Sequence, residues 1–326
     1  MRHTHSLIVV FILFVFPYIL AGQWIDQNKN LAIISQERLK THVYVLADTM
    51  AQGRATGTLG GNMAANYIQQ CFQRYGLQPY NGNSFFQRFR SGNITGHNIA
   101  GILWGRYYPM EFLVISAHYD HLGVINGTTY PGADDNASGV ALMLQVAEVF
   151  SQRARTGDPP LRSIIFVAYD GKEQGLVGSE YFAKTFRFPP QRVIANLNID
   201  QIGCNLEPPN DNPEYVLVLG ADHLTPDLRL VIDVANHYGR IGLDIDYTFY
   251  GSKNFSNIFF ELSDQIHLAK LKVPSILYTS GIHAYTYKPA DLPALVNYPV
   301  LERRTQLFYL IADDLTTRRS WLRRYY

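Results

Sequence analysis

The stretch that decides the fold reads His118-Tyr-Asp120-His121-Leu-Gly123 and, after a short gap, Pro131-Gly-Ala-Asp134-Asp135-Asn136-Ala-Ser-Gly139. An apolar run at residues 112–117 precedes it, and residues 140–150 follow with apolar side chains at helical spacing. The predicted order is therefore strand, polar loop and helix. A turn that caps the helix explains one or two of these polar residues. A histidine with several carboxylates where a strand ends is instead a suitable ligand set for zinc or a harder metal.

Two later stretches repeat this arrangement of an apolar strand followed by polar residues. Residues 163–169 lead into Asp170-Gly-Lys172-Glu173-Gln-Gly, and residues 193–199 lead into Asp200. In an open α/β sheet, ligands bind where the carboxyl ends of the strands meet. The three stretches therefore predict a single site at one edge of a sheet.

The chain has 326 residues, of which 47% are hydrophobic, so it can bury a substantial core. Predicted strands alternate with helices, which indicates an α/β fold with a mostly parallel sheet and helices on both faces. We expect one domain at residues 23–326, with a helical portion at 23–95 and a catalytic-type core at 96–318. The net charge of +1 gives no electrostatic reason to expect nucleic-acid binding.

Residues 1–22 have the pattern of a signal peptide. Arg2 and His3 precede an apolar run from Leu7 to Leu20, and Ala21-Gly22 follow. The run is shorter than the roughly 18 residues of a membrane span, which favours a cleaved signal over an uncleaved anchor. We therefore expect an exported protein, periplasmic or extracellular, with no stable membrane span after cleavage. Two cysteines allow at most one disulfide.

From Asn98 to the end of the core, these motifs resemble, in order, those of the M28 family of zinc-dependent aminopeptidases. The resemblance implies a three-layer sandwich like that of the zinc exopeptidases. It also implies hydrolysis of N-terminal peptide bonds by metal-activated water, with peptides or proteins as substrates. In the family pattern two metals share a bridging carboxylate. By position in these motifs, the resemblance implies that His118 and Asp200 bind the first metal and that Asp134 bridges the two metals. It also implies that Glu173 binds the second metal, and that Asp120 orients the His118 ring without binding a metal itself.

Two positions depart from the family pattern. Lys172 stands where the family has the glutamate that accepts a proton from water, and a charged lysine cannot accept one. Tyr287 stands where the family has its last histidine ligand, and a phenol binds metal only after losing a proton. His283, four residues earlier, is a possible substitute. Both departures weaken the second metal site, so we expect one zinc rather than two.

Three functions remain open from the sequence. The first is an exported metallo-exopeptidase with zinc, or with manganese or cobalt, since His and carboxylate ligands suit all three. The second is a non-catalytic pseudopeptidase that acts as a binding protein, which Lys172 and Tyr287 favour. The third, glutaminyl cyclisation, is less well supported because that chemistry requires the late histidine that Tyr287 replaces.

Overall fold

The computed structural model describes residues 29–205 and 212–325. The predicted signal peptide, residues 1–22, lies outside the described residues. Within them, no helix is both long enough and apolar enough to span a bilayer. Cys71 and Cys204 are both buried and unpaired, so the described chain contains no disulfide.

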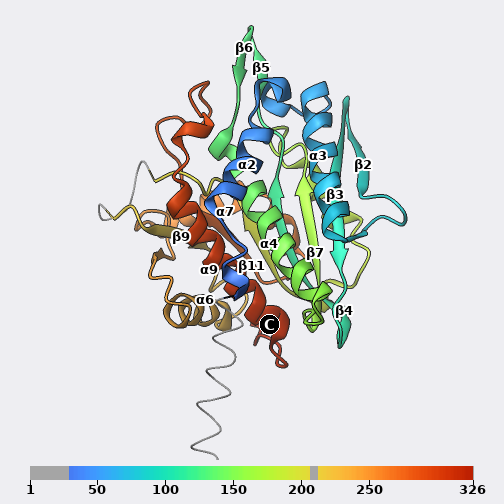
Figure 1. The fold of residues 1–326 in the computed structure, drawn as a ribbon, viewed down its shortest axis with the longest axis vertical. Coiled ribbons are helices and arrows are strands. Elements are labelled where there is room, and N and C mark those ends of the chain that lie inside the picture. The colour runs from blue at the N-terminus through green and yellow to red at the C-terminus, as the bar shows by residue number, and fades with distance from the viewer. Residues whose placement is uncertain (1–28, 206–211, 326) are drawn as a thin grey trace, which may run out of the picture.

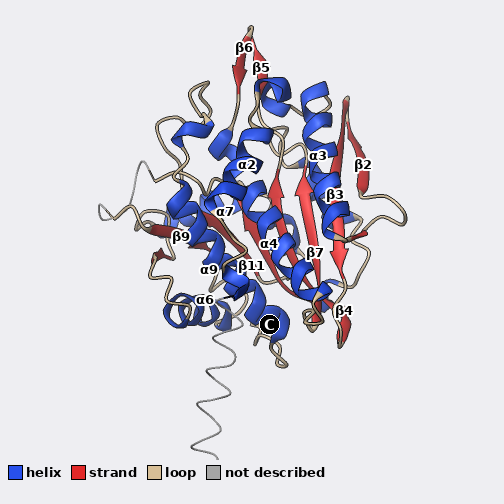
Figure 2. Cartoon of the chain, in the orientation of Figure 1, coloured by secondary structure: helices blue, strands red, loops and turns tan. Residues whose placement is uncertain are grey.

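A mixed sheet of nine strands forms the centre of the molecule, drawn in red in Figure 2. Its order is β1-β3-β7-β4-β8-β11-β9-β10, with β2 paired to β3. The four central strands β7, β4, β8 and β11 run parallel, whereas β3 and β9 flank them in the antiparallel direction. The strands are β1 (Gln78–Pro79), β2 (Phe86–Ser91), β3 (Ile94–Leu103), β4 (Tyr108–His118), β7 (Arg162–Tyr169), β8 (Val193–Ile199), β9 (Tyr215–Leu219), β10 (Asp244–Asp246) and β11 (Ser275–Thr279), and a separate hairpin comprises β5 (Gly123–Ile125) and β6 (Thr128–Tyr130).

Helices cover both faces of this sheet. One face carries α2 (Gln36–Leu46), α3 (Leu59–Tyr75), α4 (Gly139–Arg155), α6 (Asp227–Tyr238) and α9 (Tyr298–Thr317), and the other carries α5 (Val177–Lys184), α7 (Lys253–Glu261) and α8 (Gln265–Lys270). In Figure 1, α3, α4 and α9 lie in front of the strands. The α/β class predicted from the sequence is confirmed.

The apolar strands are buried on both faces, which is why they show no polar alternation. In β7, Ile164 and Phe166 pack into the larger core beneath α3, α4 and α9, while Ile165 and Val167 pack into the core beneath α5 and α8. Successive side chains of a strand point to opposite faces, so one apolar run serves two cores. The registers of β7, β4 and β8 place their carboxyl ends together at one edge of the sheet.

Candidate metal centre

The carboxyl ends of two neighbouring parallel strands bring the first candidate ligands together. Strand β4 ends at His118, and β8 ends at Ile199, directly before Asp200. These strands pair, with Ala117 opposite Ile199, so the two ligands start from adjacent positions. His118 Nε2 lies 3.0 Å from Asp200 Oδ1. The convergence predicted for these two residues is therefore present.

The third member of this group is Asp135. Its Oδ1 lies 3.4 Å from His118 Nε2, and single ligand atoms of His118, Asp135 and Asp200 all lie within 4.8 Å of one another. Both carboxylate oxygens of Asp135 are buried and have no hydrogen-bond partner among the described residues. A buried carboxylate without donors is costly, and a cation would relieve that cost. One imidazole and two carboxylates fit zinc or a similar divalent metal.

Charge around Asp135 keeps it ionised despite burial. Burial alone would raise the pKa of Asp135, but the charges of Lys172 and His118 outweigh it and hold this pKa far below its usual range. For Asp200, the same two neighbours outweigh burial and lower the pKa. Both carboxylates are therefore in the form that binds a metal.

Asp134 is the residue predicted to bridge two metals, but in the structure its neighbour Asp135 is the one that lies with His118 and Asp200. The Asp134 carboxylate points elsewhere, and its Oδ1 accepts hydrogen bonds from the backbone amides of Gly203, at 2.6 Å, and Cys204, at 3.2 Å. Its Oδ2 lies 3.1 Å from His283 Nε2. These partners satisfy Asp134 as part of the scaffold. As the candidate ligand it is replaced by Asp135.

His283, the possible substitute ligand, belongs to this scaffold as well. Its ring contacts Asp134, and the only candidate ligand group of the described residues that includes it comprises Asp134, Cys204 and His283. Cys204 is buried, and burial followed by the charge of Asp134 raises the pKa of its thiol. A thiol held in its neutral form is a poor ligand. The structure thus separates His283 from the group around His118.

Asp291 holds the turn that presents these two aspartates. Its carboxylate accepts the backbone amides of Asp134, at 2.9 Å, and Asp135, at 3.1 Å. The turn η2 (Ala133–Ser138) leads into α4, and its backbone is non-helical at Asp135 and Asn136. This irregular turn explains why two adjacent carboxylates point to different places.

Asp120 has a different contact with His118 from the one predicted. The His118 Nδ1 bonds the backbone carbonyl of Asp120 at 3.1 Å, and the Asp120 carboxylate is farther away, at 3.7 Å. That carboxylate instead accepts the backbone amides of Lys172 and Glu173, both at 3.1 Å. Asp120 therefore orients the His118 ring through its backbone and fixes the turn after β7 through its side chain.

Lys172 lies inside the cluster as a cation. Its Nζ donates to Glu173 Oε1 at 2.9 Å and to Tyr287 Oη at 3.3 Å, and it lies 3.7 Å from Asp135 Oδ1. Burial would lower the pKa of Lys172, but Asp135, Asp200 and Glu173 outweigh it and raise that pKa well above its usual value. Lys172 therefore cannot accept a proton at neutral pH. Tyr287, also predicted for this site, is present as the partner of that ammonium.

His121, for which the sequence predicts no role, lies at the site in the structure. Ligand atoms of His121, Asp135 and Glu173 lie within 4.8 Å of one another. The His121 ring lies parallel to the ring of Tyr287, with centroids 6.2 Å apart and an interplanar angle of 11°. Burial lowers the pKa of His121 to about 4, so the imidazole is neutral. The available signal was its position three residues after His118 in the same motif.

Arg54 supports the loops that carry these ligands. Its guanidinium is fully buried and donates to five backbone carbonyls, those of Leu46, Tyr119, Pro131, Gly132 and Asp135. These carbonyls belong to α2, to the loop after β4 and to the turn before α4. One side chain thus connects the two segments that supply His121 and Asp135.

We expect Arg54→Met to lower the free energy of unfolding by about 3–5 kcal/mol, because several buried carbonyls would lose their donors. Chemical denaturation of the metal-free protein measures this change. Arg90→Ala is the matched control, since Arg90 is exposed and, among the described residues, its side chain bonds only the nearby carbonyl of Gly92. This variant is expected to change stability by less than about 0.5 kcal/mol. Equal stability of the two variants would contradict this role for Arg54.

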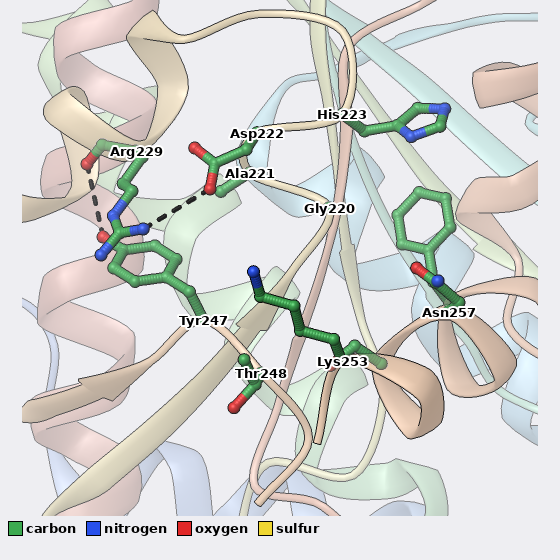
Figure 3. Close-up of a pocket in the computed structure, with 11 residues that line it drawn as sticks. Gly220, Ala221, Asp222, His223, Arg229, Tyr247, Thr248, Lys253 and Asn257 are labelled. Atoms are coloured by element: carbon green, nitrogen blue, oxygen red, sulfur yellow. Dashed lines mark hydrogen bonds and ion pairs between the residues drawn. The ribbon is translucent and has the colours of Figure 1, made fainter. Parts of the chain in front are cut away.

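One cavity lies at the carboxyl ends of the parallel strands, and another lies toward the opposite edge of the sheet, because β9 runs antiparallel to β11. One, of about 180 Å³, is lined by Lys172, Asp200 and Tyr287 together with apolar side chains, so it opens directly onto the candidate ligands. The other, of about 390 Å³, follows β9 and appears in Figure 3. There Arg229 pairs with Asp222 at 3.5 Å, and the amino group of Lys253 projects into the same space. None of the candidate metal ligands lines this second cavity.

The sequence is similar to a known protein family and to individual proteins. The model of peptidase family M28 matches residues 98–311. A probable zinc metalloprotease of Pyricularia oryzae is 40% identical over 111 residues, which are 33% of this chain and 21% of that protein. The chain covers from about a fifth to about half of the length of the curated relatives it matches.

Solved structures share the fold at low sequence identity. The LapA aminopeptidase of Legionella pneumophila is 21% identical with a TM-score of 0.70, and the alignment covers 90% of this chain and 75% of LapA. BSAP, a zinc aminopeptidase from Bacillus subtilis, is 13% identical with a TM-score of 0.68 over 87% of this chain and 96% of BSAP. The family match spans about two thirds of the sequence and includes each strand that leads to a candidate ligand. This chain therefore belongs to peptidase family M28.

Proposed function

We propose that the protein is an exported, zinc-dependent exopeptidase of the aminopeptidase type. The observation that carries this proposal is the group His118, Asp135 and Asp200, in which two carboxylates and one imidazole converge and Asp135 has no other hydrogen-bond partner among the described residues. A zinc ion held there would supply a Lewis acid for peptide hydrolysis. The names of the relatives support zinc, and the apolar run at residues 7–20 supports export.

The protein's own residues shape the substrate pocket. The 180 Å³ cavity beside Asp200 is walled by five apolar residues, namely Phe249, Phe259, Leu262, Leu277 and Ile282. The rings of Phe249 and Phe259 stack with centroids 3.7 Å apart. Burying an apolar side chain there is favourable, whereas a charged side chain would lose its hydration. We therefore propose substrates with an apolar residue such as leucine or phenylalanine next to the scissile bond.

The test combines metal analysis with an aminoacyl-arylamide assay. We expect one tightly bound zinc per chain and turnover of leucine arylamide in preference to glutamate arylamide. Chelation should remove this turnover, and added zinc should restore it. Asp200→Asn should abolish both the tight zinc and the activity. Two zinc ions per chain that both resist mild chelation, or activity that survives metal removal, would contradict the proposal.

The second candidate function is a non-catalytic peptide-binding protein, and Lys172 favours it. An ammonium paired with Glu173 at 2.9 Å occupies the position where a proton acceptor is required. If this candidate is correct, a peptide with an apolar N-terminal residue binds in calorimetry and is recovered uncleaved, with zinc present. Cleavage of that peptide by the wild-type protein, lost on Asp200→Asn, would exclude it.

A further inference from the structure

His121 has the features of an unused metal ligand. It is 1% exposed, and neither of its ring nitrogens has a hydrogen-bond partner among the described residues. Leaving buried polar atoms unpaired is unfavourable, and such atoms in a native protein require an explanation. A neutral imidazole has one nitrogen with a lone pair, and here no hydrogen bond among the described residues engages either nitrogen.

The two residues nearest to this lone pair are also of ligand type. His121 Nδ1 lies 3.9 Å from Asp135 Oδ2, and Glu173 completes a group whose ligand atoms are within 4.8 Å of each other. Ligands on one tetrahedral zinc lie about 3.4 Å apart, given bonds of about 2.1 Å. A small contraction of this group would therefore bring all three atoms onto one ion.

The ammonium of Lys172 does not occupy this position on Asp135. Lys172 Nζ and His118 Nε2 approach Oδ1 of Asp135, at 3.7 and 3.4 Å, whereas His121 faces Oδ2. The two oxygens of the Asp135 carboxylate thus face different partners, Oδ1 facing Lys172 and His118 and Oδ2 facing His121. Lys172 Nζ bonds only one oxygen of Glu173, Oε1, and a carboxylate has a second oxygen to offer.

We propose that His121, Asp135 and Glu173 form a second divalent-metal site, in which His121 takes the role that Tyr287 cannot fill. The parallel contact of the two rings places His121 beside the residue that replaced the usual ligand. The site is weaker than the His118 site, because the charge of Lys172 lies next to both Asp135 and Glu173. This inference rests on the proposed function, since Asp135 is common to both groups.

The experiment is a cobalt titration of the full chain at neutral pH, followed by visible absorption and by metal analysis after equilibrium dialysis. Wild-type protein is expected to bind one equivalent tightly and a second more weakly. His121→Phe keeps a ring against Tyr287 but removes both nitrogens, and it is expected to weaken the second step at least about a hundred-fold while keeping the first. Lys172→Met is expected to tighten the second step about tenfold or more.

The control is His42→Ala, which removes a buried imidazole on α2 that already pairs with Tyr67 Oη at 2.7 Å. Both metal steps should be unchanged in this variant. The inference is overturned if His121→Phe keeps the second step, or if neither wild type nor Lys172→Met binds a second equivalent. If wild-type protein did not bind even the first equivalent tightly, the proposed function would be refuted. Failure of the second-site proposal is therefore distinguishable from failure of the proposed function.

Discussion

Asp135→Asn is expected to weaken binding of the tight metal at least about a hundred-fold, whereas Asp134→Asn is expected to change it less than about tenfold. Removing a direct ligand costs more than the ten- to hundred-fold lost when an outer partner is removed. Asp135 contacts His118 and has free carboxylate oxygens, while Asp134 has its oxygens engaged by backbone amides and His283. Equilibrium dialysis with zinc, followed by elemental analysis, measures both affinities.

Both variants are expected to lower the stability of the metal-free protein. Asp134→Asn weakens charge-assisted hydrogen bonds to Gly203, Cys204 and His283, at a cost of about 1–3 kcal/mol in the free energy of unfolding. Asp135→Asn removes the carboxylate that the charges of Lys172 and His118 keep ionised, and it takes a partner from the buried Lys172 ammonium, so it is also expected to destabilise the metal-free chain. Chemical denaturation in the presence of a chelator makes this comparison.

One outcome would support Asp134, the residue predicted from the sequence, as the metal ligand. If Asp134→Asn lost the tight zinc while it remained folded and Asp135→Asn kept it, Asp134 would be the ligand and the turn would have to rearrange on metal binding. Loss of zinc in both variants with unchanged stability would also contradict the separation into a ligand and a scaffold residue.

The central strands could be predicted closely because their signal is local. The apolar runs at residues 163–169 and 193–199 agree with β7 and β8, to within one residue, as the structure has them. Such strands are buried on both faces, so composition alone marks their length. The convergence of His118 and Asp200 followed from the rule that ligands gather at the carboxyl ends of parallel strands.

The distinction between Asp134 and Asp135 could not be predicted in the same way. Both precede α4 in a turn whose backbone is neither helix nor strand, so no side-chain period applies. Asp291, more than 150 residues away in the sequence, fixes this turn through both backbone amides. A long-range contact of this kind determines which carboxylate faces the site.

The positions of the two histidines could not be predicted for a related reason. His283 lies four residues from Tyr287 in the sequence, but its ring contacts Asp134 at 3.1 Å. His121 follows His118 in the same loop, and its ring lies parallel to that of Tyr287. Loop residues reach a site according to tertiary packing, which spacing along the chain does not reveal.

Lys172→Glu is expected to raise the rate of aminoacyl-arylamide hydrolysis at saturating zinc by about a hundred-fold or more. A well-placed proton acceptor contributes about a hundred- to ten-thousand-fold, and the ammonium of Lys172 cannot act as one. The change also removes a positive charge beside Asp135 and Glu173, the acidic partners proposed for a second metal. Lys172→Gln removes that charge without supplying an acceptor, so it is the matched control and is expected to gain less than about tenfold.

Tyr287→His tests the remaining departure from the family pattern. Alone, it should change the rate little, because the ammonium of Lys172 remains. Combined with Lys172→Glu, it is expected to hydrolyse the substrate faster than wild type and faster than either single variant. The reason is that an imidazole can bind zinc where a neutral phenol cannot. Thermal melts at saturating zinc check that the added carboxylate beside Asp135, Glu173 and Asp200 has not unfolded the chain.

The result that would reverse this interpretation concerns the wild-type protein. If wild type turned over its substrate as fast as the double variant, and Lys172→Gln abolished that rate, Lys172 would take part directly in the reaction. Its Nζ lies 3.7 Å from Asp135 Oδ1 and 3.3 Å from Tyr287 Oη, so it would then act as a fixed cation that stabilises developing negative charge. A rate that rises on Lys172→Glu but not on Lys172→Gln instead identifies the missing carboxylate as the reason for slow turnover.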